Sequence, residues 1–193
     1  QGGGWYAPKR EAAVHDEIIT DPAQIAPLAK ERYDDNWRFR SYVKGWLDWS
    51  EKRLDAFVHE VYEEVAAEID CQSCANCCLV MRIEVDEADA KPLACRLGMS
   101  PEEFAERYLE PDGEGHNRFR DVPCAFLQEK RCSVYEDRPA DCREFPHLDK
   151  EGFRFRLIGV LDNAQYCPIV FNVLERLKAR LPYHRRRRQR HRW

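Results

Sequence analysis

The segment Cys71-Gln-Ser-Cys74-Ala-Asn-Cys77-Cys78 places four cysteines within eight residues. This C-x2-C-x2-C-C run lets one loop direct several sulfur atoms at a common point, as thiolate-bound metal ions and iron–sulfur clusters require. A disulfide between the adjacent Cys77 and Cys78 would be badly strained, whereas neighbouring thiolates can serve two different sites. The run therefore indicates a metal-binding protein.

Cysteine usage in the rest of the chain points the same way. The chain has 193 residues and an odd number of cysteines, which are Cys71, Cys74, Cys77, Cys78, Cys95, Cys124, Cys132, Cys142 and Cys167. The first residues contain no apolar core of the kind found in signal peptides, so we expect a cytoplasmic protein with reduced thiols. Such thiols bind metal more readily than they form disulfide frameworks.

The spacing predicts a first ligand set. Bacterial ferredoxins combine a C-x2-C-x2-C run with a remote cysteine that directly precedes proline. Here the corresponding residues are Cys71, Cys74 and Cys77 together with Cys167-Pro168. The spacing favours an iron–sulfur cluster of the 4Fe-4S type at this set, with zinc as the alternative because zinc accepts many thiolate spacings.

Four further cysteines form a possible second metal site, namely Cys78, Cys124, Cys132 and Cys142. The two sets could also be interleaved, so eight cysteines in all are predicted metal ligands. Cys95 lies on a helical pattern and is interpreted as a buried apolar residue rather than a ligand. His59, His116 and His147 are interpreted as surface histidines, with His147 the nearest alternative ligand.

Periodicity predicts a small α+β protein that is mainly helical, with short β-segments and a cysteine-rich core. We expect an extension at 1–18 that is unstructured or expression-derived, a helical part at 19–70, the metal-binding domain at 71–182 and a basic tail at 183–193. Helices are expected to start at Asp21-Pro22, near Asn36 and near Asp48. Further helices are expected over 86–97, from Ser100, over 138–145 and from Cys167-Pro168. Strands are expected at Met81-Arg-Ile-Glu-Val85 and over 153–161, and a hairpin at 124–134.

The charge distribution limits the possible partners. The formal net charge is −4, but residues 184–193 contain six arginines, so the rest of the chain carries −10. An acidic body makes nucleic acid an unlikely partner except through the basic tail, whose simpler interpretation is a solvated end. No stretch has the apolar length that a membrane span needs, so no membrane contact is expected.

The cysteine motif continues in two later segments. These are Pro123-Cys124-Ala-Phe126 and Cys132-Ser-Val-Tyr135-Glu-Asp-Arg138-Pro139-Ala-Asp-Cys142-Arg143-Glu-Phe145-Pro146. Together with Cys167-Pro168 they resemble the CxxCxxCC cysteine-cluster family of zinc- or iron-chelating domains, also called the YkgJ family. The resemblance covers roughly residues 71–168, and the segment Glu31-Arg-Tyr-Asp-Asp-Asn-Trp-Arg-Phe-Arg40 resembles stand-alone bacterial members. It implies metal coordination by the cysteines without choosing the metal.

Three functions fit these observations. The first is an iron–sulfur protein in electron transfer or redox chemistry, with a redox protein as partner. The second is a structural zinc module that binds a protein or nucleic acid, and the third is a metalloenzyme with an open coordination position. No catalytic residues stand out. Some larger relatives of the family are linked to flagellin lysine methylation, but this chain has no glycine-rich methyl-donor motif, so we do not expect that activity.

Overall fold

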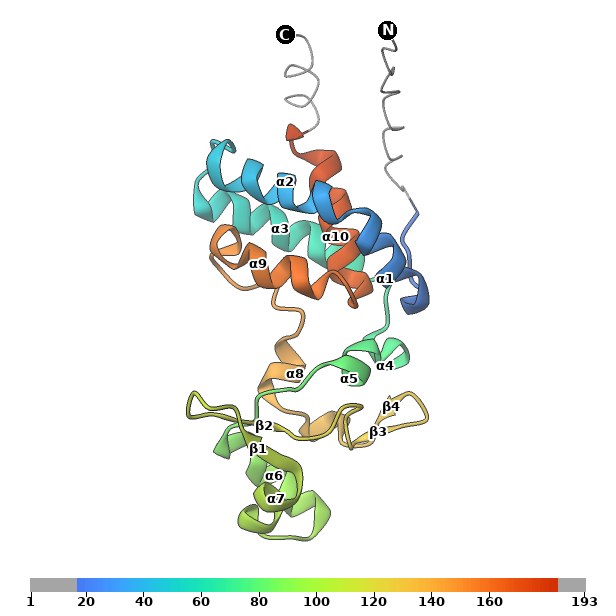
Figure 1. The fold of residues 1–193 in the computed structure, drawn as a ribbon, viewed down its shortest axis with the longest axis vertical. Helices are drawn as coiled ribbons and strands as arrows, with labels where there is room; N and C mark the ends of the chain where they lie inside the picture. Colours follow the sequence, from blue (N-terminus) through green and yellow to red (C-terminus); the bar gives the residue numbers. More distant parts are fainter. Residues whose placement is uncertain (1–16, 184–193) are drawn as a thin grey trace, which may run out of the picture.

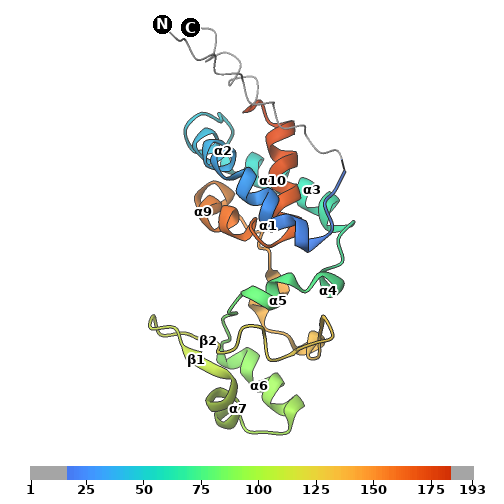
Figure 2. The same ribbon diagram turned by 45° about the vertical axis from the view of Figure 1, so that its right-hand side comes forward.

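The computed structural model describes residues 17–183, and two separate hydrophobic cores organise it. The larger core lies in a helical bundle at the top of Figures 1 and 2, and the smaller core lies in a unit at the bottom. The fold is mainly helical, with two short two-stranded sheets, which confirms the predicted class. The expectations for residues 1–16 and 184–193 fall outside the described residues.

The bundle combines helices from both ends of the chain. Its members are α1 (Pro22–Glu31), α2 (Tyr33–Gly45), α3 (Glu51–Ala66), α9 (Phe153–Asn163) and α10 (Pro168–Arg180). The predicted start of α1 is confirmed, since the Asp21 carboxylate accepts a hydrogen bond from the Ala23 N–H at 3.0 Å. The helix expected near Asp48 is capped by Ser50 instead, whose hydroxyl accepts from the Arg53 N–H.

Asn36 does not cap a helix, because α2 already begins at Tyr33 and buries this residue. Its side-chain oxygen accepts a hydrogen bond from Lys178 Nζ at 2.9 Å. Lys178 is only 2 % exposed, and its ammonium group also lies 2.5 Å from Glu175 and 3.2 Å from Asp35. A buried charge needs such partners to offset its lost hydration. This polar cluster ties α10 to α2.

Helix α9 corrects one prediction. Residues 153–161 were expected to form a β-segment, but the structure shows a helix from Phe153 to Asn163. Phe153, Leu157 and Val160 are buried at helical spacing and pack into the bundle core. Gly152 offers α9 no side-chain cap. The Asp55 carboxylate of α3 caps α9 instead, accepting hydrogen bonds from the N–H groups of Gly152 and Phe153, both at 2.9 Å.

The lower unit contains two helices and two hairpins. These are α6 (Glu87–Leu97), α7 (Pro101–Tyr108), the pair β1 (Leu109–Pro111) and β2 (Asn117–Phe119), and the pair β3 (Leu127–Gln128) and β4 (Arg131–Cys132). The capping box of Ser100 and Glu103 is confirmed. The predicted hairpin at 124–134 is confirmed too, with Glu129 and Lys130 at positive φ in its turn, as a type I′ turn requires.

The strand expected over 81–85 is reduced to one isolated bridge between Glu84 and Arg118. This segment still runs extended beside β2, because the Val85 N–H donates to the Asn117 carbonyl and the Phe119 N–H donates to the Ile83 carbonyl. Ile83 and Val85 are buried in the lower core. The segment thus leads the chain from the cysteine run into the lower unit.

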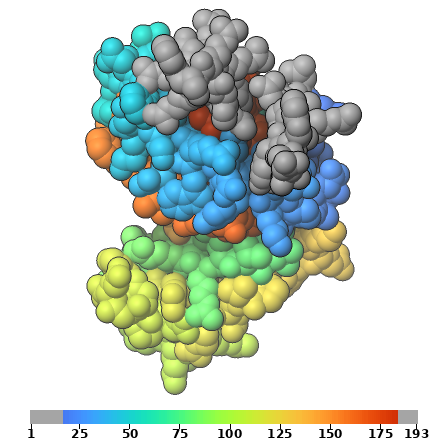
Figure 3. All heavy atoms as spheres, turned by 45° about the horizontal axis from the view of Figure 1, so that its top comes forward, coloured from blue at the N-terminus to red at the C-terminus, as the bar shows by residue number. Residues whose placement is uncertain are grey.

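Between the two cores lies a waist of short elements. It contains α4 (Cys71–Cys74), α5 (Asn76–Val80), the 3-10 turn η1 (Tyr135–Asp137) and α8 (Ala140–Glu144). Ala75 separates α4 from α5 with a left-handed conformation, φ 48°, which turns the chain between two cysteine pairs. Figure 3 shows the green α4–α5 segment crossing the surface between the bundle and the lower unit. The cysteine run is therefore placed where the two cores meet.

Candidate metal centre

A pocket of about 230 Å³ opens at the waist. Six of the predicted ligands line it, namely Cys71, Cys77, Cys78, Cys124, Cys132 and Cys142. Its walls come from both sides of the waist: Tyr62 belongs to α3 of the bundle, whereas Phe119 and Phe126 belong to the lower core. Among the described residues that line it there is no carboxylate and no histidine, so the cysteine sulfur atoms are its candidate metal ligands. Soft sulfur donors suit zinc and iron–sulfur clusters rather than magnesium or calcium.

The other two predicted ligands approach the same region from different elements. Cys74 ends α4 and is partly buried, and Cys167 directly precedes α10 and is 6 % exposed. Cys167 is thus the cysteine that the bundle contributes. The Asn76 side chain donates a hydrogen bond to the carbonyl of Tyr166 at 2.6 Å, which holds α5 against the chain just before Cys167.

Cys95 differs from its prediction. It lies on α6 but is exposed rather than buried. The neighbouring Leu93 and Ala94 occupy the buried face of the helix, which leaves the Cys95 position turned outward.

Cys77 and Cys78 form a close pair, with their Sγ atoms 4.0 Å apart. Hydrogen bonding between the two thiols stabilises the thiolate of Cys78 and lowers its pKa to about 7, while it raises the pKa of Cys77. Over residues 17–183, no three histidine, cysteine, aspartate or glutamate side chains are close enough together to hold a metal ion in the present arrangement. Metal binding therefore requires the sulfur atoms around the pocket to move toward one another.

Burial controls the protonation of the other thiols. It raises the pKa of Cys142, and nearby Cys78, Cys124 and Cys132 raise that pKa further. Burial also raises the pKa of Cys167, to about 12, and Cys71 and Cys74 add to this shift. At neutral pH these thiols hold their protons until a cation replaces them. The donors fit a thiophilic metal that displaces protons as it binds.

Backbone amides already face several of the sulfur atoms. Hydrogen bonds from a backbone N–H two or three residues further along the chain lower the pKa of four cysteines. The donors are Asn76 for Cys74, Phe126 for Cys124, Val134 for Cys132, and Val170 and then Ile169 for Cys167. Such bonds stabilise the thiolate form and orient it toward a metal. Two of these four cysteines belong to each predicted set, so backbone amides contact sulfur atoms in both sets.

A family model matches residues 70–168, slightly more than half of the chain. Its description reads "Putative zinc- or iron-chelating domain". The chain belongs to the CxxCxxCC family. A comparison with curated proteins found no match. A comparison with solved structures found none either. Membership of the CxxCxxCC family agrees with the six cysteines that line the waist pocket and leaves the choice between zinc and iron to experiment.

The polar residues of the motif have structural roles. Arg143 lies near Asp89, with its Nη2 3.5 Å from a carboxylate oxygen. His147 Nε2 lies 3.1 Å from an Asp141 carboxylate oxygen. This ion pair holds the pKa of Asp141 below its usual range through the hydrogen bond from His147. His59 and His116 are exposed, as expected.

Sequence reasoning missed two residues of the pocket wall. Neither Tyr62 of α3 nor Arg138 was predicted to belong to the site, yet both line the pocket. Burial raises the pKa of Tyr62, and Asp149, Cys71 and Cys167 raise it further, which places this phenol near the first cysteine set. A signal for Arg138 existed, because it precedes Cys142 by four residues within the motif.

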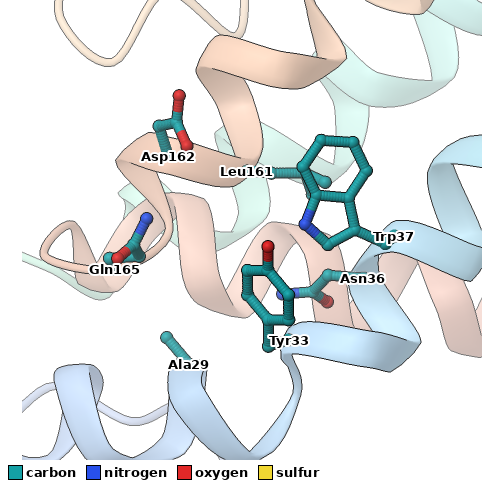
Figure 4. A pocket seen from close by; sticks show the side chains of 7 residues that line it. All are labelled: Ala29, Tyr33, Asn36, Trp37, Leu161, Asp162 and Gln165. Atoms are coloured by element: carbon teal, nitrogen blue, oxygen red, sulfur yellow. The ribbon is translucent and has the colours of Figure 1, made fainter.

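A second cavity is too small to be a binding site. It lies between α2 and α9 and measures about 20 Å³, roughly the space of one water molecule. Figure 4 shows its lining, which comprises Ala29, Tyr33, Asn36, Trp37, Leu161, Asp162 and Gln165.

Among the described helices, none has the length and apolar character needed to cross a bilayer.

Proposed function

We propose that the chain is an iron–sulfur protein whose first cluster, of the 4Fe-4S type, is held by Cys71, Cys74, Cys77 and Cys167. The single observation that carries this proposal is the position of Cys167. It lies far along the sequence from the run, yet it interacts electrostatically with Cys71 and Cys74, and it also acts on Cys77. Its residue type, its following proline and its location all match the remote ligand of a ferredoxin-type run.

A second thiolate site would use Cys78, Cys124, Cys132 and Cys142. The pKa of Cys142 responds to all three of the others, so these thiols are near neighbours. The Cys124 N–H donates to the Cys78 carbonyl at 2.8 Å, which holds the two chain segments side by side. Cys78 also acts on Cys71 and Cys74, so the two sites would be adjacent.

The number of cysteines at the waist supports a polynuclear centre or two centres over one zinc ion. Six of the eight predicted ligands line the pocket, and Cys74 and Cys167 approach the same region. Eight thiols are twice the number that one tetrahedral zinc ion uses. Electron transfer to a redox protein is the role we propose for the cluster, since Cys71 is exposed and offers a short route to the surface.

A structural zinc module is the second candidate, and one observation favours it. The two hydrophobic cores share no buried residue, and the predicted ligands come from both sides of the waist. A zinc ion bound there would fasten the two cores together, as structural zinc does in small domains.

The two candidates are separated by the composition and colour of anaerobically purified protein. The iron–sulfur proposal predicts iron, a matching amount of acid-labile sulfide and broad visible absorption that bleaches on reduction. Colourless protein with stoichiometric zinc and no sulfide would overturn it in favour of the structural module. Iron and zinc are measured in the same sample, so each result excludes the other candidate.

A further inference from the structure

Arg138 is held rigidly in the wall of the pocket. Its guanidinium carbon lies 3.7 Å from the centroid of the Tyr135 ring, and its Nη1 donates a hydrogen bond to the Tyr135 carbonyl at 2.6 Å. The Arg143 side chain donates to the Arg138 carbonyl and so fixes the backbone as well. Pro139 follows directly and starts α8. The position of this cation is therefore set before any ligand binds.

No carboxylate within residues 17–183 forms an ion pair with Arg138. Neighbouring arginines differ in this respect: Arg96 pairs with Asp137 at 2.6 Å, and Arg143 lies near Asp89. Arg138 is half-buried, and a guanidinium in that position loses hydration that a counter-charge normally replaces. Among the described residues that line the pocket, the only groups that can become anions are the thiols and the phenols of Tyr62 and Tyr135.

The charge of Arg138 reaches both cysteine sets. Arg138 lines the pocket together with Cys71 and Cys77 of the first set. The four cysteines of the second set, Cys132 among them, line the same pocket. Cys71 and Cys132 belong to α4 and β4, two elements that meet at the waist. Arg138 thus lies where one cation acts on a ligand of each set.

We propose that Arg138 is a positioning residue that supplies the counter-charge of the thiolate-bound centres. It thereby sets the reduction potential of a cluster, or the affinity for zinc in a zinc centre. The inference rests on the proposed function, because a centre with four thiolate ligands carries net negative charge. A fixed cation nearby stabilises the more negative, reduced state of a cluster and thereby raises its reduction potential. In a zinc centre the same cation would slow the loss of the metal by favouring the thiolates over the thiols.

The test compares Arg138→Gln and Arg138→Lys with the wild type. Lys44→Gln is the matched control, because Lys44 is exposed on α2 and its substitution removes the same charge far from the pocket. Metal and sulfide contents are measured first, followed by the reduction potential in a spectroscopic titration. We expect full metal content in all variants and a more negative potential for Arg138→Gln. Arg138→Lys should restore most of the potential, and Lys44→Gln should match the wild type.

A merely structural role of Arg138 would lower the melting temperature without moving the potential. An unchanged potential in fully loaded Arg138→Gln would therefore overturn the inference. If the wild type carries zinc without sulfide, the iron–sulfur proposal fails and the inference is tested by transfer of zinc to a chelator. The expected change is then a fall in zinc affinity of about 10–100-fold for Arg138→Gln, and equal affinity would refute the counter-charge.

Discussion

Replacing Cys167 with serine tests whether the bundle supplies a metal ligand. Serine is a preferred residue before the first turn of a helix, and its hydroxyl can keep the amide contacts that Ile169 now makes with the sulfur. The helix α10 should therefore persist. Structural zinc contributes about 10–16 kcal/mol through four ligands, so one ligand accounts for about 3–4 kcal/mol. Loss of that share lowers metal affinity by about 100- to 1,000-fold. An iron–sulfur cluster would be lost or greatly reduced in occupancy.

Metal content, chelator competition and far-UV circular dichroism together measure this effect. We expect Cys167→Ser to keep the helical signal and to lose one centre, with Cys74→Ser losing the same centre. The double variant should lose no more metal than either single variant, because both residues serve one site. Cys95→Ser is the matched control and should retain every metal equivalent. Wild-type metal content in Cys167→Ser, or a further loss in the double variant, would refute the grouping of the first set.

Three other outcomes follow from the structure. Zinc affinity should rise steeply with pH as long as the pH stays below the raised pKa values of the first set, which all lie above the usual value of a cysteine thiol. Each bound ion then displaces up to about four protons, and chelator competition with a pH-independent affinity would contradict this. Asp55→Ala should destabilise the fold by about 1–2 kcal/mol and lower the melting temperature by about 2–6 °C, because it leaves two N–H groups of α9 without their cap, whereas Asp48→Ala should have little effect. Metal removal should speed amide hydrogen exchange at residues 70–78 and 122–145, while the amides of the bundle helices stay protected. A uniform loss of protection over the described residues would contradict the presence of two separate cores.

Local signals in the sequence predicted many of the elements. Asp21-Pro22, the capping box of Ser100 with Glu103, and Cys167-Pro168 all start helices in the structure. Gly98 ends α6 in the left-handed conformation that glycine adopts at low cost. These features depend on neighbours within one helical turn, so a single sequence contains the information they need.

Features that depend on distant contacts escaped prediction. The start of α9 is capped by Asp55, nearly a hundred residues away, so no local signal marked it as a helix. Asn36 looked like a cap, yet its real partner is Lys178 on another helix. Arg138 received no predicted role, because only the folded chain brings it into the same pocket wall as Cys71 and Cys132. Sequence spacing could divide the cysteines into two sets of four. Whether the sulfur atoms of a set lie close together depends on how the two cores meet.

X-ray absorption spectroscopy at the metal edge tests the central claim most directly, since it measures the atoms bound to the metal. The account predicts a first shell made of sulfur alone at about 2.3 Å, with an additional iron–iron contribution if the centre is a cluster. A first shell containing mainly nitrogen or oxygen would contradict an all-cysteine centre at the waist.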